Sequence, residues 1–406
     1  MISVEEAQQR VLDAVRLLGT ERVLFTQALG RVLREDVRAT HDIPQGDNSA
    51  MDGYAVRAAD ITSASNSAPA VLRVIEDLGA GSLAQNRVEP GTATRIMTGA
   101  LMPEGADTVA HVEITDAGSS EVRVFRPLVS GTNVRRRGED MTRGSIVLAA
   151  GSRIGPAEVG VLASAQRSVV TAGRRPTVAI ISTGSEIVDI DATLELGKVI
   201  NSNSYSLSAL ASAAGAIPRM IGIVPDTPQA TIAAIESALE SDFLVSSGGV
   251  SVGAYDFVKE ALDALGAETS FWQVSMKPGK PVVLSQLRSR LYFGLPGNPV
   301  SCMVSFHLFV VPALRKAMGQ SGDLLPPAIA IRLAGPLRSR GDRRAYQRVR
   351  VAAVGGQLVA VPMTSQGSGV STSMVEANGL AIVEEGVTRI DEGAMVQTVL
   401  IGPIRS

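Results

Sequence analysis

The chain has 406 residues, which is more than one ordinary domain of about 150 residues holds. Hydrophobic residues make up 45% of it and charged residues 19%, a composition that excludes wholesale disorder because such a chain buries enough apolar surface to offset its ordering entropy. With 38 basic and 40 acidic residues the net charge is -2, so the chain as a whole does not attract a polyanion and any anion-binding site must be local.

The chain opens with a helix and continues into a long β region. Ser3 and Glu6 are spaced as a capping box ahead of apolar residues at helical spacing, which predicts an amphipathic helix. From 36 to 134 short apolar runs alternate with Gly, Pro, Asn and Asp, a pattern typical of β structure. A second helix is predicted from Pro156, and the segment 173–176 marks a boundary.

After this boundary, strand-like runs alternate with helix-length segments. The predicted strands are 177–182, 220–224, 243–246, 271–275 and 291–294, and the predicted helices are 204–214, 228–239, 255–265 and 300–318. This order is typical of a mostly parallel sheet with helices on both faces, in which ligands bind beyond the carboxyl ends of the strands. From 326 onward, Pro and Gly separate short strand-like runs, which predicts a small β domain.

Cysteine content and hydropathy predict a soluble cytoplasmic protein that does not contact a membrane. The single cysteine, Cys302, excludes an intrachain disulfide framework and a cysteine-based zinc cluster. The first residues show no basic segment followed by an apolar stretch, as a signal peptide would. The most apolar window, 300–314, is shorter than the roughly 20 residues that cross a bilayer.

Charged residues stand at the ends of the central strands. Glu186, Asp226 and Asp256 follow three of the strands, and Lys277 and Lys280 follow a fourth. Carboxylates are the ligands that Mg²⁺ prefers, whereas ammonium groups suit phosphate or another oxyanion. Each acid taken singly has an equally good interpretation as a helix-terminal residue, but the set predicts a metal-assisted reaction on an anionic substrate.

Two loops in this region are candidates for ligand binding. The glycine-rich segment 246–253 follows a strand but matches neither the P-loop nor the dinucleotide fingerprint, so an ATPase or a dehydrogenase is not indicated. The segment 295–301, LPGNPVS, presents backbone amides and Ser301 at a helix start. It is either an anion cradle or a plain turn that leads into a helix.

Two further segments lie in the first half of the chain. DNSAMDGYAVR, 47–57, predicts a tight polar turn in which Asp52 either binds a metal or caps the turn, with Tyr54 as a buried prop. RRRGED, 135–140, is either a solvated charged loop or an anion clamp in which Asp140 is a metal or base partner.

A basic patch lies near the C-terminus. The segment 338–350 carries six arginines and one acid, and guanidinium groups bind oxyanions in a bidentate manner. The patch therefore suits phosphate or a tetrahedral metal oxyanion. RNA binding is the rival interpretation, but with 3% aromatic residues the chain lacks stacking platforms, and we predict no nucleic-acid partner.

Taken in order, eight motifs resemble those of the molybdopterin molybdenumtransferases, the bacterial relatives of the gephyrin E domain. They are NSAMDGYA, RIMTG, GED, STGSE, GGVSVG, MKPGKP, LPGNPVS and QGS, at 48–55, 95–99, 138–140, 182–186, 248–253, 276–281, 295–301 and 366–368. The resemblance covers nearly the whole chain, and the combination of NSAMDGYA with MKPGKP and LPGNP is highly specific.

The resemblance implies an activity and a set of partners. A member of this family takes adenylylated molybdopterin and molybdate as substrates, inserts molybdenum into the pterin dithiolene and releases AMP with Mg²⁺ as cofactor. It also implies a homodimer whose cleft combines the central domain of one subunit with the β subdomain of the other. Contacts with the upstream adenylyltransferase and with downstream cofactor proteins would follow.

The implied fold is α/β and multidomain. A central, mostly parallel α/β sheet would span 174–325, with an elongated N-terminal unit from 1–45 plus 138–173. An inserted, mainly β subdomain would span 46–137, and a C-terminal β-barrel-like domain 326–406.

The resemblance also implies roles for individual residues. Those implied in catalysis are Asp52, Thr98, Asp140, Glu186, Asp226 and Asp256, of which the last three would hold Mg²⁺. Those implied in binding are Lys277, Lys280, Pro296, Pro299, Ser301, Arg343, Arg348 and Ser368. Ala254 and Gly369 depart from residues common in the family, which affects the details of metal binding.

Two other functions compete with this one. The same strand ends would serve a nucleotide pyrophosphatase that acts on other dinucleotides, in which AMP release would not respond to molybdate. The chain would also serve as a non-catalytic dimeric scaffold, against which the acidic and lysine residues at the strand ends argue.

Overall fold

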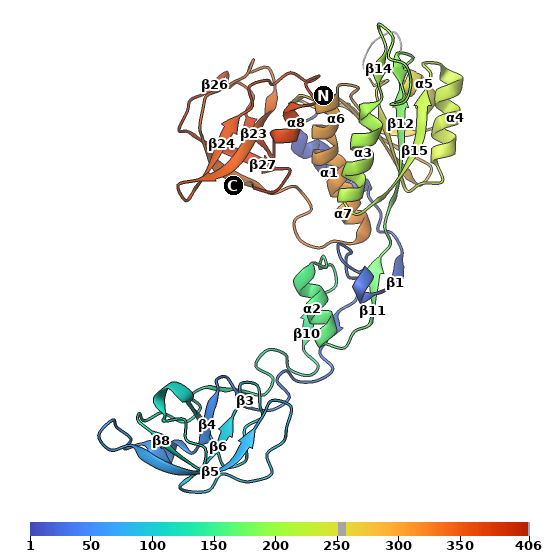
Figure 1. The fold of residues 1–406 in the computed structure, drawn as a ribbon. Helices are drawn as coiled ribbons and strands as arrows, with labels where there is room; N and C mark the ends of the chain where they lie inside the picture. The colour runs from blue at the N-terminus through green and yellow to red at the C-terminus, as the bar shows by residue number, and fades with distance from the viewer. Residues whose placement is uncertain (251–256, 405–406) are drawn as a thin grey trace. The chain divides into compact units, whose positions relative to one another are not determined.

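The computed structural model describes residues 1–250 and 257–404. The chain forms two compact units and passes between them more than once (Figure 1). The larger unit holds Met1–Glu35, Ala150–Gly155 and Val169–Ser406, and the smaller unit holds Asp36–Ala149 and Pro156–Ser168. This division is coarser than the four segments expected from the sequence, so those boundaries stay predictions.

A six-stranded sheet with the order β15-β12-β16-β20-β19-β17 forms the centre of the larger unit. Its strands are β12 (Thr177–Thr183), β15 (Ile217–Val224), β16 (Phe243–Ser247), β17 (Glu268–Gln273), β19 (Pro281–Leu287) and β20 (Arg290–Leu295). Strands β15, β12, β16 and β20 are parallel. The mostly parallel sheet and its five predicted strands are confirmed.

Strand β19 is absent from the predicted strands, because it follows a Pro- and Gly-rich loop and itself begins with Pro281, a residue that strand interiors avoid. It runs antiparallel to both of its neighbours, β17 and β20. Strand β17 therefore runs parallel to β20, and its carboxyl end lies at the same edge as those of the parallel strands. The loop that carries Lys277 and Lys280 is thus at this edge, as the strand order predicts.

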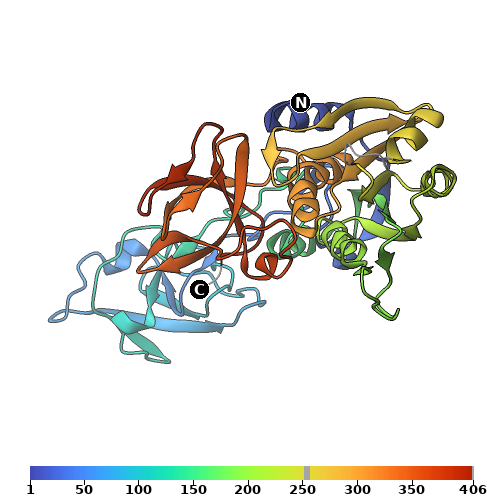
Figure 2. The same cartoon turned by 90° about the horizontal axis from the view of Figure 1, so that it is seen from above.

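Helices cover both faces of the sheet (Figures 1 and 2). They are α1 (Val4–Ala14), α3 (Ser202–Ala213), α4 (Pro228–Ala238), α5 (Phe257–Ala264), α6 (Pro299–Ser305) and α7 (Val311–Met318). Val178 and Ile180 of β12 pack with residues of α1, α3, α6 and α7, whereas Ala179 and Ile181 pack with residues of α4 and α5. This alternation is expected when successive strand residues point to opposite faces.

The segment Pro299–Met318 is one continuous helical stretch, in which a π-helical turn, Phe306–Val310, joins α6 to α7. In the described part of the chain it is the one helix whose length and composition would allow it to cross a membrane. However, 78% of its apolar window is buried inside the protein. Cys302 on this helix is 1% exposed, and burial raises the pKa of its thiol to about 12. The helix is therefore a core helix.

The C-terminal part of the larger unit is a closed five-stranded barrel. Its strands are β21 (Ala328–Leu333), β23 (Arg344–Val354), β24 (Gln357–Pro362), β25 (Gly379–Val383) and β27 (Met395–Leu400). The pairing of β23 with β25 closes the barrel, which confirms the predicted barrel-like domain. Strand β18 (Met276–Lys277), from the loop at the carboxyl edge of the central sheet, pairs with β23.

The larger unit contains further short elements. They are β1 (Thr20–Leu24), η1 (Phe25–Gln27), β11 (Val169–Gly173), β13 (Ile187–Val188), β14 (Val199–Ile200), β22 (Leu337–Arg338), α8 (Ser373–Glu376) and β26 (Arg389–Ile390). Strands β1 and β11 are antiparallel, and β11 leads directly into β12.

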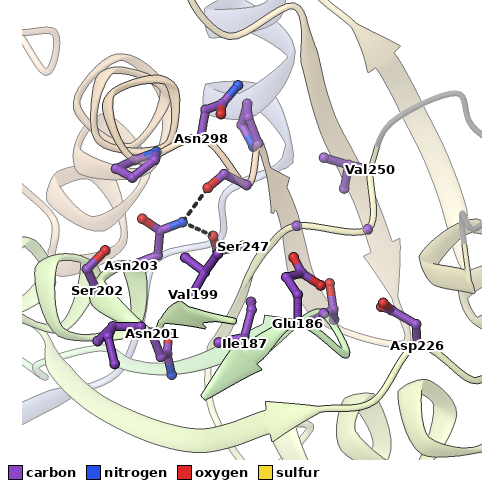
Figure 3. Close-up of a pocket in the computed structure, with 18 of the residues that line it drawn as sticks. Glu186, Ile187, Val199, Asn201, Ser202, Asn203, Asp226, Ser247, Val250 and Asn298 are labelled. Atoms are coloured by element: carbon purple, nitrogen blue, oxygen red, sulfur yellow. Dashed lines mark hydrogen bonds between the residues drawn. The ribbon is translucent and has the colours of Figure 1, made fainter. Parts of the chain in front are cut away.

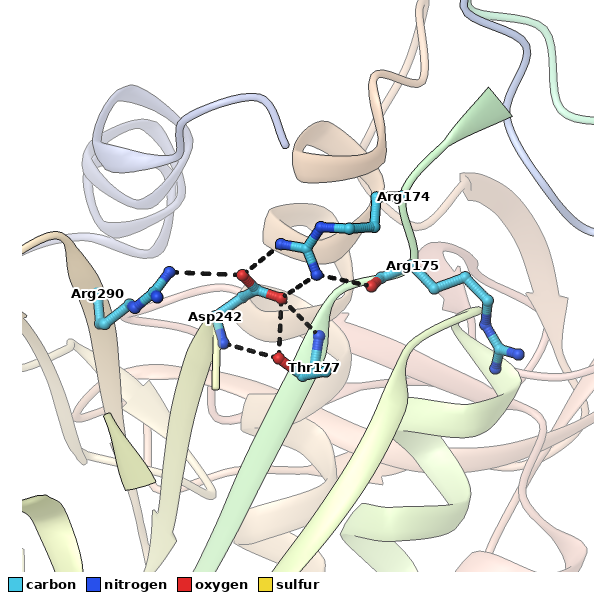
Figure 4. A network of polar contacts seen from close by, with 5 residues as sticks. All are labelled: Arg174, Arg175, Thr177, Asp242 and Arg290. Atoms are coloured by element: carbon cyan, nitrogen blue, oxygen red, sulfur yellow. Dashed lines mark hydrogen bonds and ion pairs between the residues drawn. The ribbon is translucent and has the colours of Figure 1, made fainter. Parts of the chain in front are cut away.

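A buried carboxylate ties the start of β12 to its neighbours (Figure 4). Asp242 accepts two hydrogen bonds from the Arg174 guanidinium, at 2.6 and 2.9 Å, and a weaker contact from Arg290 at 3.4 Å. It also accepts bonds from the backbone N–H and the hydroxyl of Thr177, both at 2.8 Å. Burial by itself would raise the pKa of Asp242, but the bonds from Arg174 and Thr177 outweigh it and hold the pKa below its usual value.

We expect Asp242→Ala to lower the free energy of unfolding by about 2–3 kcal/mol, because hydrogen bonds to a charged acceptor are lost together. With Asp242→Asn, the loss should be fully present at neutral pH and should shrink as the pH falls through the depressed pKa of the carboxyl, which lies below 3.8. Urea unfolding between pH 7 and pH 3 measures this difference. Asp263→Asn, on the exposed face of α5, is the control, and a loss of equal size at every pH would contradict the assignment.

The smaller unit is mainly β, as predicted. Its five-stranded sheet has the order β7-β4-β6-β5-β8, made of β4 (Gly53–Val56), β5 (Ala70–Leu78), β6 (Thr92–Ile96), β7 (Thr108–His111) and β8 (Glu121–Val124). The other elements are β2 (Val37–Arg38), β3 (Asn48–Ser49), η2 (Ala58–Ile61), η3 (Val112–Ile114), β9 (Val134–Arg135), β10 (Ile146–Leu148) and α2 (Pro156–Ser164). Helix α2 confirms the helix predicted from Pro156.

The NSAMDGYA motif forms the polar turn before β4. Tyr54 is 1% exposed and donates a hydrogen bond to the Gly118 carbonyl at 2.9 Å, so it is the predicted buried prop. A Cβ atom at Gly53 would lie 2.1 Å from the Ala110 carbonyl oxygen, so only glycine allows β4 to approach β7 this closely.

Candidate active site

A cavity of about 620 Å³ lies at the carboxyl edge of the central sheet. The residues that line it come from the ends of β12, β15, β16 and β20, from the starts of α3, α6 and β19, and from the short strands β13 and β14. We call it the acidic pocket, because the charged residues among those that line it are Glu186 and Asp226. Parallel strands direct their carboxyl ends to one edge, which is why residues 40 positions apart in the chain meet here.

Both carboxylates lie on the same side of the acidic pocket (Figure 3). Asp226 is held in place by Ser185: its Oδ2 accepts from the Ser185 N–H at 2.9 Å, and its own N–H donates to the Ser185 hydroxyl at 3.2 Å. Lys198 donates to the Ser185 carbonyl at 2.9 Å. The Asp226 backbone is thereby fixed, while carboxylate lone pairs remain available to a ligand.

Asn203 links the two loops on the opposite wall. Its Nδ2 donates to the Ser247 hydroxyl at 2.6 Å and to the Gly297 carbonyl at 2.7 Å (Figure 3). The position of Asn203 in the sequence indicates no more than a helix cap, because polar residues are typical at the start of a helix. Its proximity to both loops is a long-range property that no local pattern indicates.

Sterics explain why two glycines follow β16. Gly248 and Gly249 have φ angles of +94° and +64°, in the left-handed region. A Cβ atom at Gly248 would lie 2.7 Å from the Thr183 carbonyl oxygen, and one at Gly249 would lie 2.7 Å from Val258 Cγ2. Only glycine allows the chain to turn here against β12.

A second cavity, of about 440 Å³, lies between the central sheet and the barrel. We call it the basic pocket, because cationic side chains and hydroxyl groups line it. The predicted residues among them are Lys277, Lys280, Ser301, Arg343 and Ser368, and Arg338, Tyr346 and Gln366 also line it. Arg343 Nη2 also forms an ion pair with Asp342 Oδ2 at 2.9 Å.

Backbone hydrogen bonds between the central domain and the barrel hold the walls of the basic pocket together. Lys277 pairs with Ala345 in the ladder of β18 and β23, which brings the MKPGKP loop to the barrel. The Val300 N–H, in the first turn of α6, donates to the Ser368 carbonyl at 3.1 Å. Ser301 and Ser368 therefore lie in adjoining parts of the wall although 66 residues separate them in the chain.

The two pockets adjoin, and Pro281, Pro296 and Asn298 line both. The sequence predicts that carboxylates and lysines converge at one rim. In the described residues this edge holds two adjoining cavities: Glu186 and Asp226 line one, and Lys277 and Lys280 line the other. The lysine loop lies at the predicted edge of the sheet, and the pairing of β18 with β23 brings it to the barrel. Pro299 lines the acidic pocket.

Several predicted site residues are not among those that line the two cavities. The Arg348 guanidinium is buried and is not among the residues that line either cavity. Asp256 lies outside the described residues. Asp140, in the smaller unit, is exposed, and its backbone N–H donates to the Ile43 carbonyl at 3.0 Å.

Asp52 and Thr98 are brought together in the smaller unit. Asp52 Oδ1 accepts from the Thr98 N–H at 2.7 Å and from its hydroxyl at 2.8 Å, and these two bonds lower the pKa of Asp52. Both residues are exposed. Asp52 therefore stays ionised at neutral pH at the surface of this unit.

Two arginines of the RRRGED segment form ion pairs within the smaller unit. Arg136 forms an ion pair with Asp47 at 2.6 Å, and Arg137 forms one with Asp42 at 2.6 Å. Their charges are largely matched, so the interpretation as a solvated charged loop is favoured over an anion clamp for these two side chains.

Three family models match successive parts of the chain. The MoeA N-terminal region (domain I and II) matches residues 2–166, the probable molybdopterin binding domain matches 179–316, and the MoeA C-terminal region (domain IV) matches 330–401. The molybdopterin molybdenumtransferase of Bacillus subtilis (strain 168) is 36% identical over 98% of this chain and 94% of its own length. The chain belongs to the molybdopterin molybdenumtransferase family.

Other members of the family are similar over their full length. The enzyme of the same name from Nostoc sp. is 38% identical over 97% of this chain and 92% of its own length. The crystal structure of the molybdopterin biosynthesis MoeA protein from Pyrococcus horikoshii OT3 superposes with a TM-score of 0.85 at 29% identity, over 98% of this chain and 100% of that chain. The chain is thus a transferase of molybdenum cofactor biosynthesis with a molybdopterin-binding domain.

The carboxylates of the acidic pocket fit a hard cation. Within residues 1–250 and 257–404, no group of three or more His, Cys, Asp or Glu side chains is arranged to hold a metal ion. Glu186 and Asp226 nevertheless line one pocket and offer carboxylate oxygens. Mg²⁺ commonly takes one or two protein carboxylates and completes its shell with water and phosphate oxygens.

Proposed function

We propose that the chain inserts molybdenum from molybdate into adenylylated molybdopterin and releases AMP. The observation that supports this function is the pairing of an acidic and a basic pocket across a shared wall of Pro281, Pro296 and Asn298. A phosphoanhydride with its cation and a tetrahedral dianion need opposite surroundings, and here the two environments adjoin. Two bound reactants held side by side gain the advantage of proximity.

The basic pocket would bind molybdate. Lys277, Lys280 and Arg343 would supply positive charge, and Ser301 and Ser368 hydroxyl groups would donate hydrogen bonds to its oxygens. Ser301 is 4% exposed, so its hydroxyl is already removed from bulk water before the ligand arrives. Preorganised donors of this kind bind an oxyanion without reorganisation at the moment of reaction.

The acidic pocket would bind the adenylylated pterin. Glu186 and Asp226 would hold Mg²⁺, with Asp256 as the third ligand expected from the sequence. When bound, the ion neutralises charge on the phosphoanhydride. Pro296 and Pro299 would form stiff walls, and Asn203 would hold the Ser247 and Gly297 loops at their spacing.

The reaction balances without an electron donor. Water cleaves the phosphoanhydride and AMP departs. The two thiol groups of the pterin then bind molybdenum through sulfur and replace one oxo ligand of molybdate, which takes up the two thiol protons and leaves as water. Molybdenum remains in the same oxidation state throughout. The protein has one cysteine, and it is buried in a core helix, so the sulfur ligands must come from the substrate.

The decisive test mixes the purified chain with adenylylated molybdopterin, molybdate and Mg²⁺ and follows AMP. We expect AMP release to depend on molybdate and to accompany formation of the molybdenum-bound pterin. AMP release that ignores molybdate would support a nucleotide pyrophosphatase and contradict the proposal.

We also propose a homodimer in which the smaller unit of one subunit completes the active site of the other. This arrangement would give Asp52, Thr98 and Asp140 a catalytic role, although they lie in a different unit from the two pockets. A cytoplasmic location and contacts with the upstream adenylyltransferase and downstream cofactor proteins complete the proposal.

Heterodimers of two inactive variants test the shared site. We expect a dimer of one Asp52→Asn subunit and one Asp226→Asn subunit, isolated with two affinity tags, to have about half the activity of the wild-type dimer. One of its two sites would carry both substitutions and the other neither.

The control pairs Glu186→Gln with Asp226→Asn, both in the larger unit. Each site of that dimer would carry a substitution, so activity should not return. An inactive heterodimer in the first experiment would place Asp52 and Asp226 in the same subunit's site and contradict the shared arrangement.

A further inference from the structure

Arg348 is the largest fully buried side chain in the described residues, with 0% of it exposed. It lies on β23, where alternate residues face opposite sides. Val349 and Val351 pack inside the barrel, whereas Tyr346 packs outside it, against the core that the central sheet shares with α1. By this alternation Arg348 also faces away from the barrel interior.

Three nitrogen atoms of the Arg348 guanidinium have unequal surroundings. Nη2 donates to the Ser365 carbonyl at 2.9 Å and to the Gly367 carbonyl at 3.0 Å. Nε and Nη1 are buried without a hydrogen-bond partner, and in the described part of the chain no carboxylate forms an ion pair with Arg348. Burial lowers the pKa of the guanidinium, but arginine remains protonated in proteins.

The loop around Arg348 is the wall of the basic pocket. The Gln366 side chain accepts a hydrogen bond from the backbone N–H of Arg348 and donates one to the backbone carbonyl of Arg348, both at 2.9 Å. The side chain of Gln366 thus pairs with the backbone of β23 as a neighbouring strand would. Gln366, Gly367 and Ser368 all line the basic pocket. Arg348 therefore stands directly behind the wall that the proposed ligand would contact.

We propose that Arg348 is a positioning residue whose unpaired positive charge makes the basic pocket selective for doubly charged oxyanions. This inference rests on the proposed function of the basic pocket. It gives Arg348 a different role from direct binding, because the side chain would act through the wall by its charge and by holding the loop 365–368, without touching the ligand.

The physical reason is the missing counter-charge. Burying a cation without a partner is unfavourable, and a bound anion one residue layer away supplies the charge that the protein lacks. Coulomb energy is proportional to the charge of the ligand, so a fixed cation favours a dianion over a monoanion of the same shape. If Arg348 only held the loop in place, its replacement would weaken the binding of a dianion and a monoanion by the same factor.

Molybdate and perrhenate test this difference, because both are tetrahedral oxyanions of similar size and they carry two charges and one. Calorimetric titration of the full chain would measure both affinities in the wild type and in Arg348→Met. We expect the loss for molybdate to be about the square of the loss for perrhenate, so that a threefold loss for one accompanies a loss of about ninefold for the other. Arg348→Lys, which keeps the charge, should retain the wild-type ratio.

Arg350→Met is the matched control, since Arg350 is exposed two residues further along the same strand. It should leave the ratio unchanged. Arg348→Gln, a neutral side chain that still donates to a carbonyl, replaces Arg348→Met if that variant does not fold. Equal losses for the two anions, or no loss, would overturn the inference alone. A wild-type chain that bound neither anion would overturn it together with the assignment of the basic pocket.

Discussion

Asp226→Asn should reduce AMP release by about 100-fold or more while leaving molybdate affinity unchanged. Asparagine keeps the size of the side chain and can still accept the bond from the Ser185 N–H, so the local backbone is preserved. What is lost is the negative charge that the acidic pocket offers to Mg²⁺. Discontinuous assay of AMP and calorimetric titration with molybdate measure the two effects separately.

Asp191→Asn is the control for this experiment. Asp191 is exposed on the segment between β13 and β14, and it is not among the residues that line the acidic pocket. Its replacement by Asn removes one negative charge from the same domain, outside the acidic pocket. AMP release and molybdate affinity should both stay unchanged. Wild-type AMP release by Asp226→Asn would remove Asp226 from the site, whereas a parallel loss of molybdate binding would mean that the two pockets do not act independently.

Lys277→Met should weaken molybdate binding by about 10- to 100-fold, the range expected when a charge-assisted hydrogen bond to an anion is lost. The backbone pairing of Lys277 with Ala345 does not depend on the side chain, so the MKPGKP loop should stay attached to the barrel. AMP release should then require a higher molybdate concentration but reach the same maximum rate. Titration of the reaction with molybdate at saturating pterin substrate measures this shift.

Lys259→Met serves as the matched control, because Lys259 lies on α5 and its ammonium group stands over the Trp272 ring, outside both pockets. The same charge is removed without a change at the proposed ligand. Unchanged molybdate dependence in Lys277→Met would exclude Lys277 from the binding site. A lower maximum rate with unchanged dependence would instead assign Lys277 to the chemical step.

The edge of the sheet was predictable because its signals are local. Glu186 and Asp226 each follow an apolar run of strand length, and the order of strands and helices indicates parallel pairing. Parallel pairing then brings the carboxyl ends to one edge whatever the details of packing. For the same reason the amphipathic helix α1 could be located from its periodicity, and the core helix Pro299–Met318 from the length of its segment after a predicted strand.

The division into two pockets was not predictable from those signals. It depends on the antiparallel strand β19, on the pairing of β18 with β23 and on the bond from Val300 to Ser368. Each of these contacts is made by backbone N–H and carbonyl groups, which nearly every residue carries. No residue type in the sequence therefore indicates where such contacts form. The role of Asn203 was not predictable for a related reason, since its partners Ser247 and Gly297 are far away in the chain.

The arginine segment separates the two kinds of information most clearly. Its letters establish a concentration of positive charge near the C-terminus, and the motifs by themselves establish the family, because both are properties of residue order. They do not say that Arg344 pairs with Glu384, that Arg343 faces a cavity or that Arg348 is sealed behind its wall. Those differences arise only in the folded protein, since solvent exposure and charge pairing depend on which distant segments cover a side chain.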